Sequence, residues 1–91
     1  MFNKLKQLKD LRSHAKTMQD ALSTERVTEE RGGVTIVMNG NMEVLSVTMA
    51  AGLSKDATET GVKNCVNDTI KKAQRLMAKK MQEMGGFPGL N

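Results

Sequence analysis

The sequence predicts an α+β fold: one helix, a three-stranded antiparallel meander and a long second helix. Two observations lead to this prediction. Apolar residues recur at steps of three and four near both ends of the chain, whereas they alternate at steps of two between about residues 34 and 49. Gly and Asn residues mark the turns between the alternating segments. Because no linker or internal repeat interrupts this order, residues 1–84 are expected to form a single domain.

The first helix is expected over residues 2–24, which contain many strong helix formers and no Gly or Pro. Its apolar positions follow the spacing of a heptad seam. They are Leu8, Leu11, Ala15, Met18 and Leu22. At about 100° per residue these side chains fall within roughly a 100° arc. That side of the helix is therefore expected to need a partner surface.

Three strands are expected to follow the first helix. Residues 25–31 read as a short polar strand that suits the edge of a sheet, and the Gly pair after it reads as a turn. Residues 34–40 alternate in polarity, which is typical of a strand with one buried face. The side chains expected on that face are Val34, Ile36 and Met38.

The Asn39-Gly40 pair is expected to form a two-residue hairpin turn, in which both positions need positive φ. The third strand is then expected over residues 42–49. Strict alternation would divide its side chains between the two faces of the sheet. One face would carry Leu45, Val47 and Met49, and the other Val44, Ser46 and Thr48.

The second helix is expected from about residue 55 to residue 84. Asp56, with Glu59 three residues later, resembles a capping box at its start. Gly61 is expected to weaken the first turns by about 1 kcal/mol relative to Ala. A Gly pair ends the helix, and residues 85–91 are expected to be a flexible tail.

One apolar stripe follows the second helix at steps of three and four. It consists of Val62, Val66, Ile70, Ala73, Met77, Met81 and Met84. A helix of about 29 residues is about 43 Å long, whereas a three-stranded sheet is only about 15 to 20 Å across. The far half of the helix is therefore expected to project beyond the sheet, where another chain or the first helix would cover its methionines.

A homodimer is expected on the same grounds. A chain of 91 residues without Trp or Tyr buries a thin core, and pairing with a second copy would help to hold the fold. The residues predicted at the dimer interface are Val66, Ile70, Met77, Met81 and Met84.

Positive charge is concentrated on both predicted helices. The segment KKAQRLMAKK, residues 71–80, holds five basic residues and no acid, and the isoelectric point of about 9.5 favours an acidic partner. At helical spacing the basic side chains lie apart from the apolar stripes. The predicted DNA-binding residues are Lys4, Lys6, Lys9, Arg12, Lys16, Lys71, Lys72, Arg75, Lys79 and Lys80.

Such a surface suits the phosphates of double-stranded DNA. With Phe2 and Phe87 as its two aromatic residues, the chain has little to stack on unpaired bases. Nothing in the sequence indicates base-specific contacts. The same charges are also typical of a solvated helix face whose cations complement the helix dipole near its C-terminus, so this interpretation stays open.

An enzyme is not expected, because His14 and Cys65 lie on different predicted helices and no metal-ligand spacing surrounds them. We expect His14 to be solvated or half-buried and Cys65 to pack in the core. No metal, cofactor or small-molecule substrate is indicated. A lone cysteine fits the cytoplasm, and no apolar run suits a signal peptide or a membrane span.

Five segments also carry a resemblance through their order and spacing. They are MFNKL, AKTMQ at 15–19, GGVTIVMNGNMEVLSVTM, VNDT at 66–69 and GGFPGL. Together they resemble the YbaB/EbfC family of bacterial nucleoid-associated proteins, over essentially the whole chain. The resemblance implies a tweezer-shaped homodimer that binds DNA through projecting helices, in the nucleoid and with a role in gene regulation. It points to the same basic residues of both helices.

Two other interpretations stay open. In a protein interaction module, the heptad seam from Leu8 to Leu22 would dock a helix of another protein, and the basic charge would be incidental. A membrane-surface binder would lay an amphipathic helix on anionic lipid, but the apolar faces lack Trp and Phe. Salt-dependent binding to duplex DNA separates the nucleic-acid interpretation from the interaction module, and liposome flotation tests the membrane-surface binder.

Overall fold

The computed structural model describes the backbone of residues 2–85 and the side chains from residue 4 onward. Its elements, in chain order, are α1 (Phe2–Ser23), β1 (Arg26–Arg31), β2 (Val34–Asn39), β3 (Val44–Met49) and α2 (Lys55–Glu83). The predicted α+β fold is confirmed, and each predicted boundary lies within two residues of the observed one. The predicted tail lies outside the described residues, apart from Gly85.

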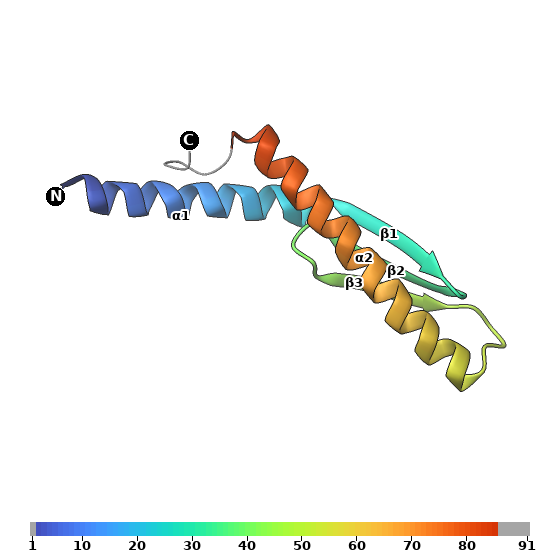
Figure 1. The fold of residues 1–91 in the computed structure, drawn as a ribbon. Helices are drawn as coiled ribbons and strands as arrows, with labels where there is room; N and C mark the ends of the chain where they lie inside the picture. The colour runs from blue at the N-terminus through green and yellow to red at the C-terminus, as the bar shows by residue number, and fades with distance from the viewer. Residues whose placement is uncertain (1, 86–91) are drawn as a thin grey trace.

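The molecule is elongated, with principal extents of 63 × 19 × 18 Å. Its radius of gyration is 17.7 Å, whereas a compact chain of this length would have about 12 Å. Most of the extra length is α1, which extends away from the sheet (Figure 1). Among residues 4–23 of α1, only the last turns are packed, with Met18 5% and Leu22 2% exposed. The larger projection is therefore α1, and not the far half of α2 as the sequence suggested.

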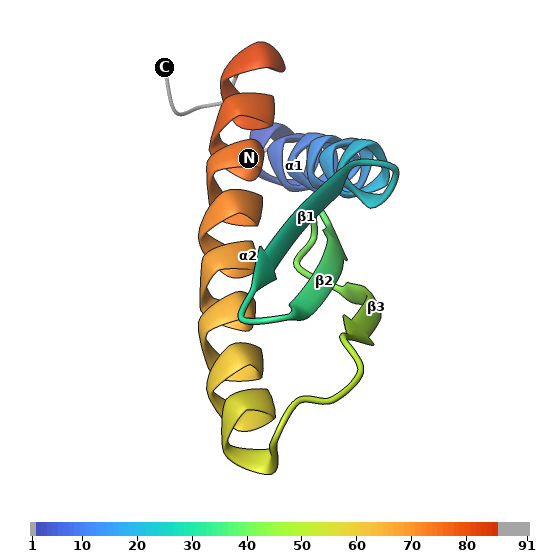
Figure 2. The ribbon, with the colours of Figure 1, turned by 90° about the vertical axis from the view of Figure 1, so that its right-hand side faces the viewer.

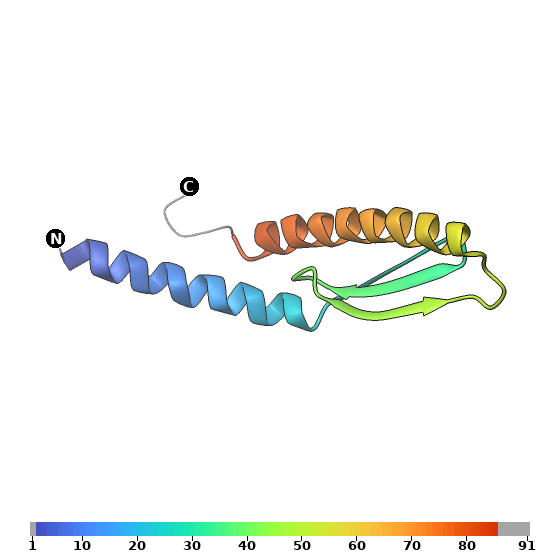
Figure 3. The ribbon, with the colours of Figure 1, turned by 90° about the horizontal axis from the view of Figure 1, so that it is seen from below.

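The three strands form one antiparallel sheet in the order β1-β2-β3. Helix α2 crosses one face of this sheet, as the views in Figures 2 and 3 show. The predicted alternation of β2 is confirmed, because Val34, Ile36 and Met38 are buried beneath α2. The core is a thin layer between α2 and the strands β1 and β2, joined by Val27 of β1.

The predicted faces of β3 are wrong at the start of the strand, at Val44 and Leu45. The register shifts by one between Val37 and Met38, because Val37 pairs with Ser46 while Met38 pairs with Val44. Leu45 is the extra residue of this bulge. Residues paired across an antiparallel sheet share a face, so Val44 lies on the α2 side. The β3 side chains on that side are therefore Val44, Val47 and Met49.

The predicted two-residue turn at Asn39-Gly40 is also wrong. Asn39 ends β2, and its side-chain Oδ1 accepts hydrogen bonds from the backbone N–H groups of Asn41 (2.9 Å) and Glu43 (3.0 Å). Positive φ occurs at Met42, where it is 64°, and not at Asn39 or Gly40. The turn is longer because the Asn39 side chain, rather than the backbone alone, organises it.

Gly40 is needed for a different reason, which is its contact with α1. A Cβ at this position would lie 2.7 Å from Leu22 Cδ2 and 2.9 Å from the Leu22 carbonyl oxygen. The Gly40 N–H instead donates a 2.9 Å hydrogen bond to that carbonyl. This close approach anchors the C-terminal end of α1 against the sheet and so fixes where the helix leaves the body of the protein.

The start of α2 differs from the predicted capping box. The N-cap is Ser54, whose Oγ accepts a 3.0 Å hydrogen bond from the N–H of Ala57. Asp56 lies in the first turn, where its charge complements the helix dipole. Ser54 precedes Asp56 by two residues and has the extended backbone that an N-cap requires.

The apolar stripe predicted for α2 is displaced from the true centre of its buried face. That centre is formed by small residues at four-residue steps, which are Gly61, Cys65, Thr69 and Ala73. Val62, Val66 and Ile70 pack beside it and stay partly exposed. The sequence pattern marked the larger apolar residues, but small ones occupy the centre because they allow the helix to approach the sheet closely.

Gly61 shows how close this approach is. A Cβ there would lie 2.9 Å from Val34 Cγ2 and 3.2 Å from the Arg31 carbonyl oxygen. Cys65 and Thr69 follow along the same line, and the Cys65 Sγ lies 3.2 Å from the carbonyl oxygen of Glu29, to which it donates. The predicted packing role of Cys65 is therefore confirmed, and Gly61 has a packing role that outweighs its low helix propensity.

We expect Gly61→Ala to lower the free energy of unfolding by about 1 kcal/mol. Overpacking typically costs about 1 to 3 kcal/mol, whereas the gain in helix propensity is about 1 kcal/mol. Urea denaturation at one fixed protein concentration measures the change. Thr60→Ala, at the exposed neighbouring position, is the control and should raise stability by a few tenths of a kcal/mol. Equal stabilisation by both variants would contradict the packing role of Gly61.

Candidate nucleic-acid interface

The side of α2 that faces β1 carries a ladder of three ion pairs. Arg31 Nη1 lies 2.6 Å from Asp68 Oδ2, Lys72 Nζ lies 3.3 Å from Glu29 Oε1, and Lys80 Nζ lies 2.9 Å from Glu25 Oε1. The spacing of the pairs follows from the rise per residue of the strand and of the helix. Four strand residues span about 13 Å and eight helix residues about 12 Å, so successive pairs remain in register.

We did not predict this ladder from the sequence, although the alternation of side chains along β1 indicates it. Val27 is buried on the α2 side of β1, so the residues two positions away in either direction face the same helix. Those residues are Glu25, Glu29 and, two further on, Arg31. Two of the lysines in residues 71–80 therefore have carboxylate partners that the segment itself lacks.

Lys72 and Lys80 are held by more than one contact each. Lys72 Nζ also donates a 3.2 Å hydrogen bond to the carbonyl oxygen of Thr28. Lys80 Nζ lies 4.0 Å from Glu83 in addition to its contact with Glu25. The hydrogen bond to Glu25 and the charge of that carboxylate raise the pKa of Lys80 above the ordinary lysine value. Lys80 therefore stays protonated across the neutral range.

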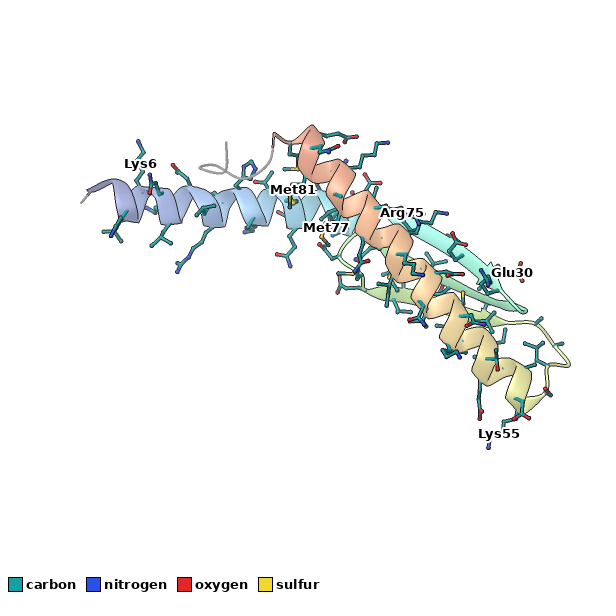
Figure 4. The ribbon with its side chains drawn as sticks, in the orientation of Figure 1. Lys6, Glu30, Lys55, Arg75, Met77 and Met81 are labelled. Carbon is teal, nitrogen blue, oxygen red and sulfur yellow. The ribbon has the colours of Figure 1, made fainter. Side chains whose placement is uncertain are left out.

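The other three cations of this segment form the α2 basic face, which we define as Lys71, Arg75 and Lys79. All three side chains are exposed, and none makes an ion pair or hydrogen bond with another residue in the described part of the chain. Arg75 lies on the side of α2 away from Met77 and Met81 (Figure 4). Steps of four residues place these cations about 6 Å apart along the helix.

The second predicted set of cations lies along the α1 arm, which we define as residues 4–16. Its members are Lys4, Lys6, Lys9, Arg12 and Lys16, all of them exposed. Within residues 4–85 none of these side chains forms an ion pair. Lys6 lies far out on the arm (Figure 4). In a single chain the two basic sets therefore occupy different parts of the molecule and do not form one cluster.

The apolar seam of the α1 arm is uncovered in the single chain. Leu5 is 76%, Leu8 54% and Leu11 37% exposed. The seam becomes buried only at Met18 and Leu22, where α1 reaches the sheet. The expected partner surface for the first part of the seam is therefore not supplied within residues 4–85.

A second apolar surface lies between α2 and β3. Val44, Val47 and Met49 of β3 are about half exposed, at 52%, 49% and 48%, because α2 packs mainly over β1 and β2. At about 100° per residue, most of the α2 stripe lies roughly 120° to 180° around the helix from Lys72. Since Lys72 faces β1, this part of the stripe flanks β3. It consists of Val66, Ile70, Met77, Met81 and Met84, all of them half-buried.

Two features bear on other functions. His14 is half-buried on α1, and Cys65 is buried in the core beneath α2, so the structure does not bring them together. Among the described residues, no group of three or more His, Cys, Asp or Glu side chains is placed to hold a metal ion. Neither described helix has the length and apolar character needed to cross a membrane.

Comparison with known proteins points in one direction. A family model described as the YbaB/EbfC DNA-binding family matches residues 1–87. A nucleoid-associated protein of Syntrophobacter fumaroxidans (strain DSM 10017 / MPOB) is 32% identical over 98 residues, covering 98% of this chain and 89% of the relative. A nucleoid-associated protein of Nitrobacter hamburgensis (strain DSM 10229 / NCIMB 13809 / X14) is 34% identical over 92 residues, covering 94% and 87%.

Proposed function

This chain belongs to the YbaB/EbfC DNA-binding family, and we propose that it is a nucleoid-associated protein that binds double-stranded DNA chiefly through phosphate contacts. The observation that supports this most directly is the set of exposed cations without ion-pair partners in residues 4–85, on the α2 basic face and the α1 arm. Solvated helix faces usually mix charges of both signs, whereas residues 71–80 carry five cations and no acid, and the α1 arm carries five Lys and Arg residues against one acid, Asp10. The proposed contacts are made by eight of the ten basic residues predicted from the sequence, whereas Lys72 and Lys80 are engaged by Glu29 and Glu25. The eight are Lys4, Lys6, Lys9, Arg12, Lys16, Lys71, Arg75 and Lys79.

Phosphate contacts fit the chemistry of this surface better than base contacts. The three cations of the α2 basic face span about 12 Å, a length over which duplex DNA presents about seven phosphate charges. The described helix faces carry lysine and arginine, and residues 4–85 contain no Phe, Tyr or Trp to stack on unpaired bases. Binding of this kind positions a protein on many sequences and is compatible with a role in organising the nucleoid and in gene regulation.

The proposed active form is a tweezer-like homodimer, with residues 1–84 of each chain acting as one DNA-binding domain. A second copy would cover the apolar surface between α2 and β3, which a lone chain leaves about half exposed. The β3 edge supports this, because its sequence VLSVTM has no charged residue or Pro to prevent pairing with another strand. Dimerisation would double the basic surfaces, and the proposed location is the nucleoid within the cytoplasm.

One observation favours a second candidate function. The exposed leucines of the α1 arm are Leu5, Leu8 and Leu11, and their spacing suits docking of another protein's helix. In that case the cations of α1 would only keep the helix soluble. The two functions differ in their dependence on salt, since binding to DNA phosphates weakens steeply as salt rises and apolar docking does not.

We expect the double variant Arg75→Gln, Lys79→Gln to weaken binding to random-sequence duplex DNA. The plot of log K against log salt has a negative slope, and each lost phosphate contact should make that slope shallower by about 0.9. Fluorescence anisotropy at several salt concentrations between 50 and 200 mM measures both affinity and slope. Unrelated duplexes should be affected equally, because phosphates carry no sequence information.

The matched control for this test is Lys55→Gln, Lys63→Gln, which removes two positive charges from the opposite end of the same helix. It should lower the affinity slightly and leave the slope almost unchanged. Equal slopes for the two variants would mean that only net charge matters. Unchanged binding by the Arg75 and Lys79 variant would favour the interaction module instead.

A separate prediction concerns the dimer. We expect Met77→Asp with Met81→Asp to give a monomer in sedimentation velocity, because two carboxylates would be placed on the proposed apolar interface. Gln74→Asp with Ala78→Asp adds the same charges at the same spacing on the exposed side of α2 and should leave the dimer intact. A Met77 and Met81 variant that stays dimeric and folded by circular dichroism would show that the interface lies elsewhere.

A further inference from the structure

We infer that Glu25 and Glu29 limit DNA binding by holding Lys80 and Lys72 away from phosphates. The inference rests on the proposed function, since it concerns the number of phosphate contacts that α2 makes. In this arrangement the α2 surface has two classes of cation. Lys71, Arg75 and Lys79 are available to phosphates, and the two lysines of the ladder are held in reserve.

The first argument for this inference is the placement of the held lysines. Lys72 follows Lys71 directly, and Lys80 follows Lys79, so each held lysine is the sequence neighbour of an available one. The helical rotation of about 100° turns the held lysine of each pair toward β1, where a carboxylate lies 3.3 Å or 2.9 Å from its Nζ. Without the carboxylate, each held lysine would add its charge next to that of an available one.

The second argument is the negative charge of the glutamate in each pair. A phosphate that approaches Lys72 or Lys80 also meets the carboxylate of Glu29 or Glu25, which repels it. Breaking the pair would leave that carboxylate close to the DNA without a partner. Each glutamate therefore limits binding in two ways. It engages a lysine, and it repels the phosphate that would take its place as the partner of that lysine.

The exposure of the pairs makes the inference testable. The side chains are 48% and 33% exposed for Lys72 and Glu29, and 26% and 35% for Lys80 and Glu25. The Lys72 and Glu29 pair is exposed enough to contribute little to stability. The Lys80 and Glu25 pair is half-buried, so removing both negative charges should lower stability somewhat and leave the fold intact.

Strand β1 and the turn after β2 supply a matched control. Glu30 pairs with Thr35 on the sheet face away from α2, and its Oε1 accepts a 3.3 Å hydrogen bond from the N–H of Gly33. Glu43 Oε1 accepts a 2.8 Å hydrogen bond from Asn39 Nδ2. Gln at either position keeps a carbonyl oxygen for these donors, and neither substitution releases a lysine of α2.

The experiment compares Glu25→Gln, Glu29→Gln with Glu30→Gln, Glu43→Gln, both of which remove two negative charges. Binding to random-sequence duplex DNA is measured between 50 and 200 mM salt. We expect the first variant to bind roughly tenfold or more tightly at the lower salt and to steepen the slope of log K by about 0.9 for each newly engaged phosphate. The control should bind only slightly more tightly, with the wild-type slope.

A second comparison starts from the lysines themselves. In the wild-type background, Lys72→Gln with Lys80→Gln should leave the slope unchanged, whereas it should abolish the extra slope of the Glu25 and Glu29 variant. Circular dichroism confirms that each variant is folded. A lysine variant that flattens the wild-type slope as much as Arg75→Gln, Lys79→Gln would overturn the inference.

The outcomes separate this inference from the proposed function. If the wild type binds with a salt-dependent slope and the Glu25 and Glu29 variant matches its control, the proposed function stands and the inference fails. If the wild type does not bind but the Glu25 and Glu29 variant does, the restraint by the glutamates is supported. If neither protein binds duplex DNA, both are overturned.

Discussion

The close approach of α2 to the sheet is the contact on which the rest of the structure depends. It is possible because the buried centre of the helix consists of Gly61, Cys65, Thr69 and Ala73, and a Cβ at Gly61 would already touch Val34 at 2.9 Å. Small residues let the helix axis lie near the strands, so one helix covers β1 and β2 but does not reach across β3. Both the basic surface and the uncovered apolar surface follow from this position.

The position of α2 divides its circumference into three parts with different chemistry. The centre is buried, the side toward β1 carries the ion-pair ladder next to the α2 basic face, and the side toward β3 carries half-buried apolar residues. Charges and apolar side chains are thus kept on opposite sides of one rigid element. A second copy placed on the apolar side would leave the cations exposed, which is why DNA binding and dimerisation are compatible proposals for the same helix.

Much of the fold could be predicted from local patterns, and the errors have local physical causes. The alternation of β2 and the helical periods of the two ends identified all five elements. The bulge at Leu45 was not predictable, because it depends on how β3 pairs with β2 and not on the β3 sequence alone. The turn at Asn39 was misjudged because Gly40 serves the contact with Leu22 rather than a positive φ. At the candidate site, the sequence identified the cations but not that Glu25 and Glu29 would engage two of them.

The sequence by itself determined the order of the elements, the excess of positive charge on both helices and the resemblance to a DNA-binding family, because these depend on residue type and short-range spacing. The tertiary structure decided which side of α2 is buried, that α1 is the projecting arm, and which lysines are available to phosphates. These properties depend on residues far apart in the chain, such as Glu25 and Lys80, whose distance of 2.9 Å is set by the packing of a strand against a helix. Helical periodicity shows that a helix has an apolar side, but steric fit against the sheet selects the direction in which that side points.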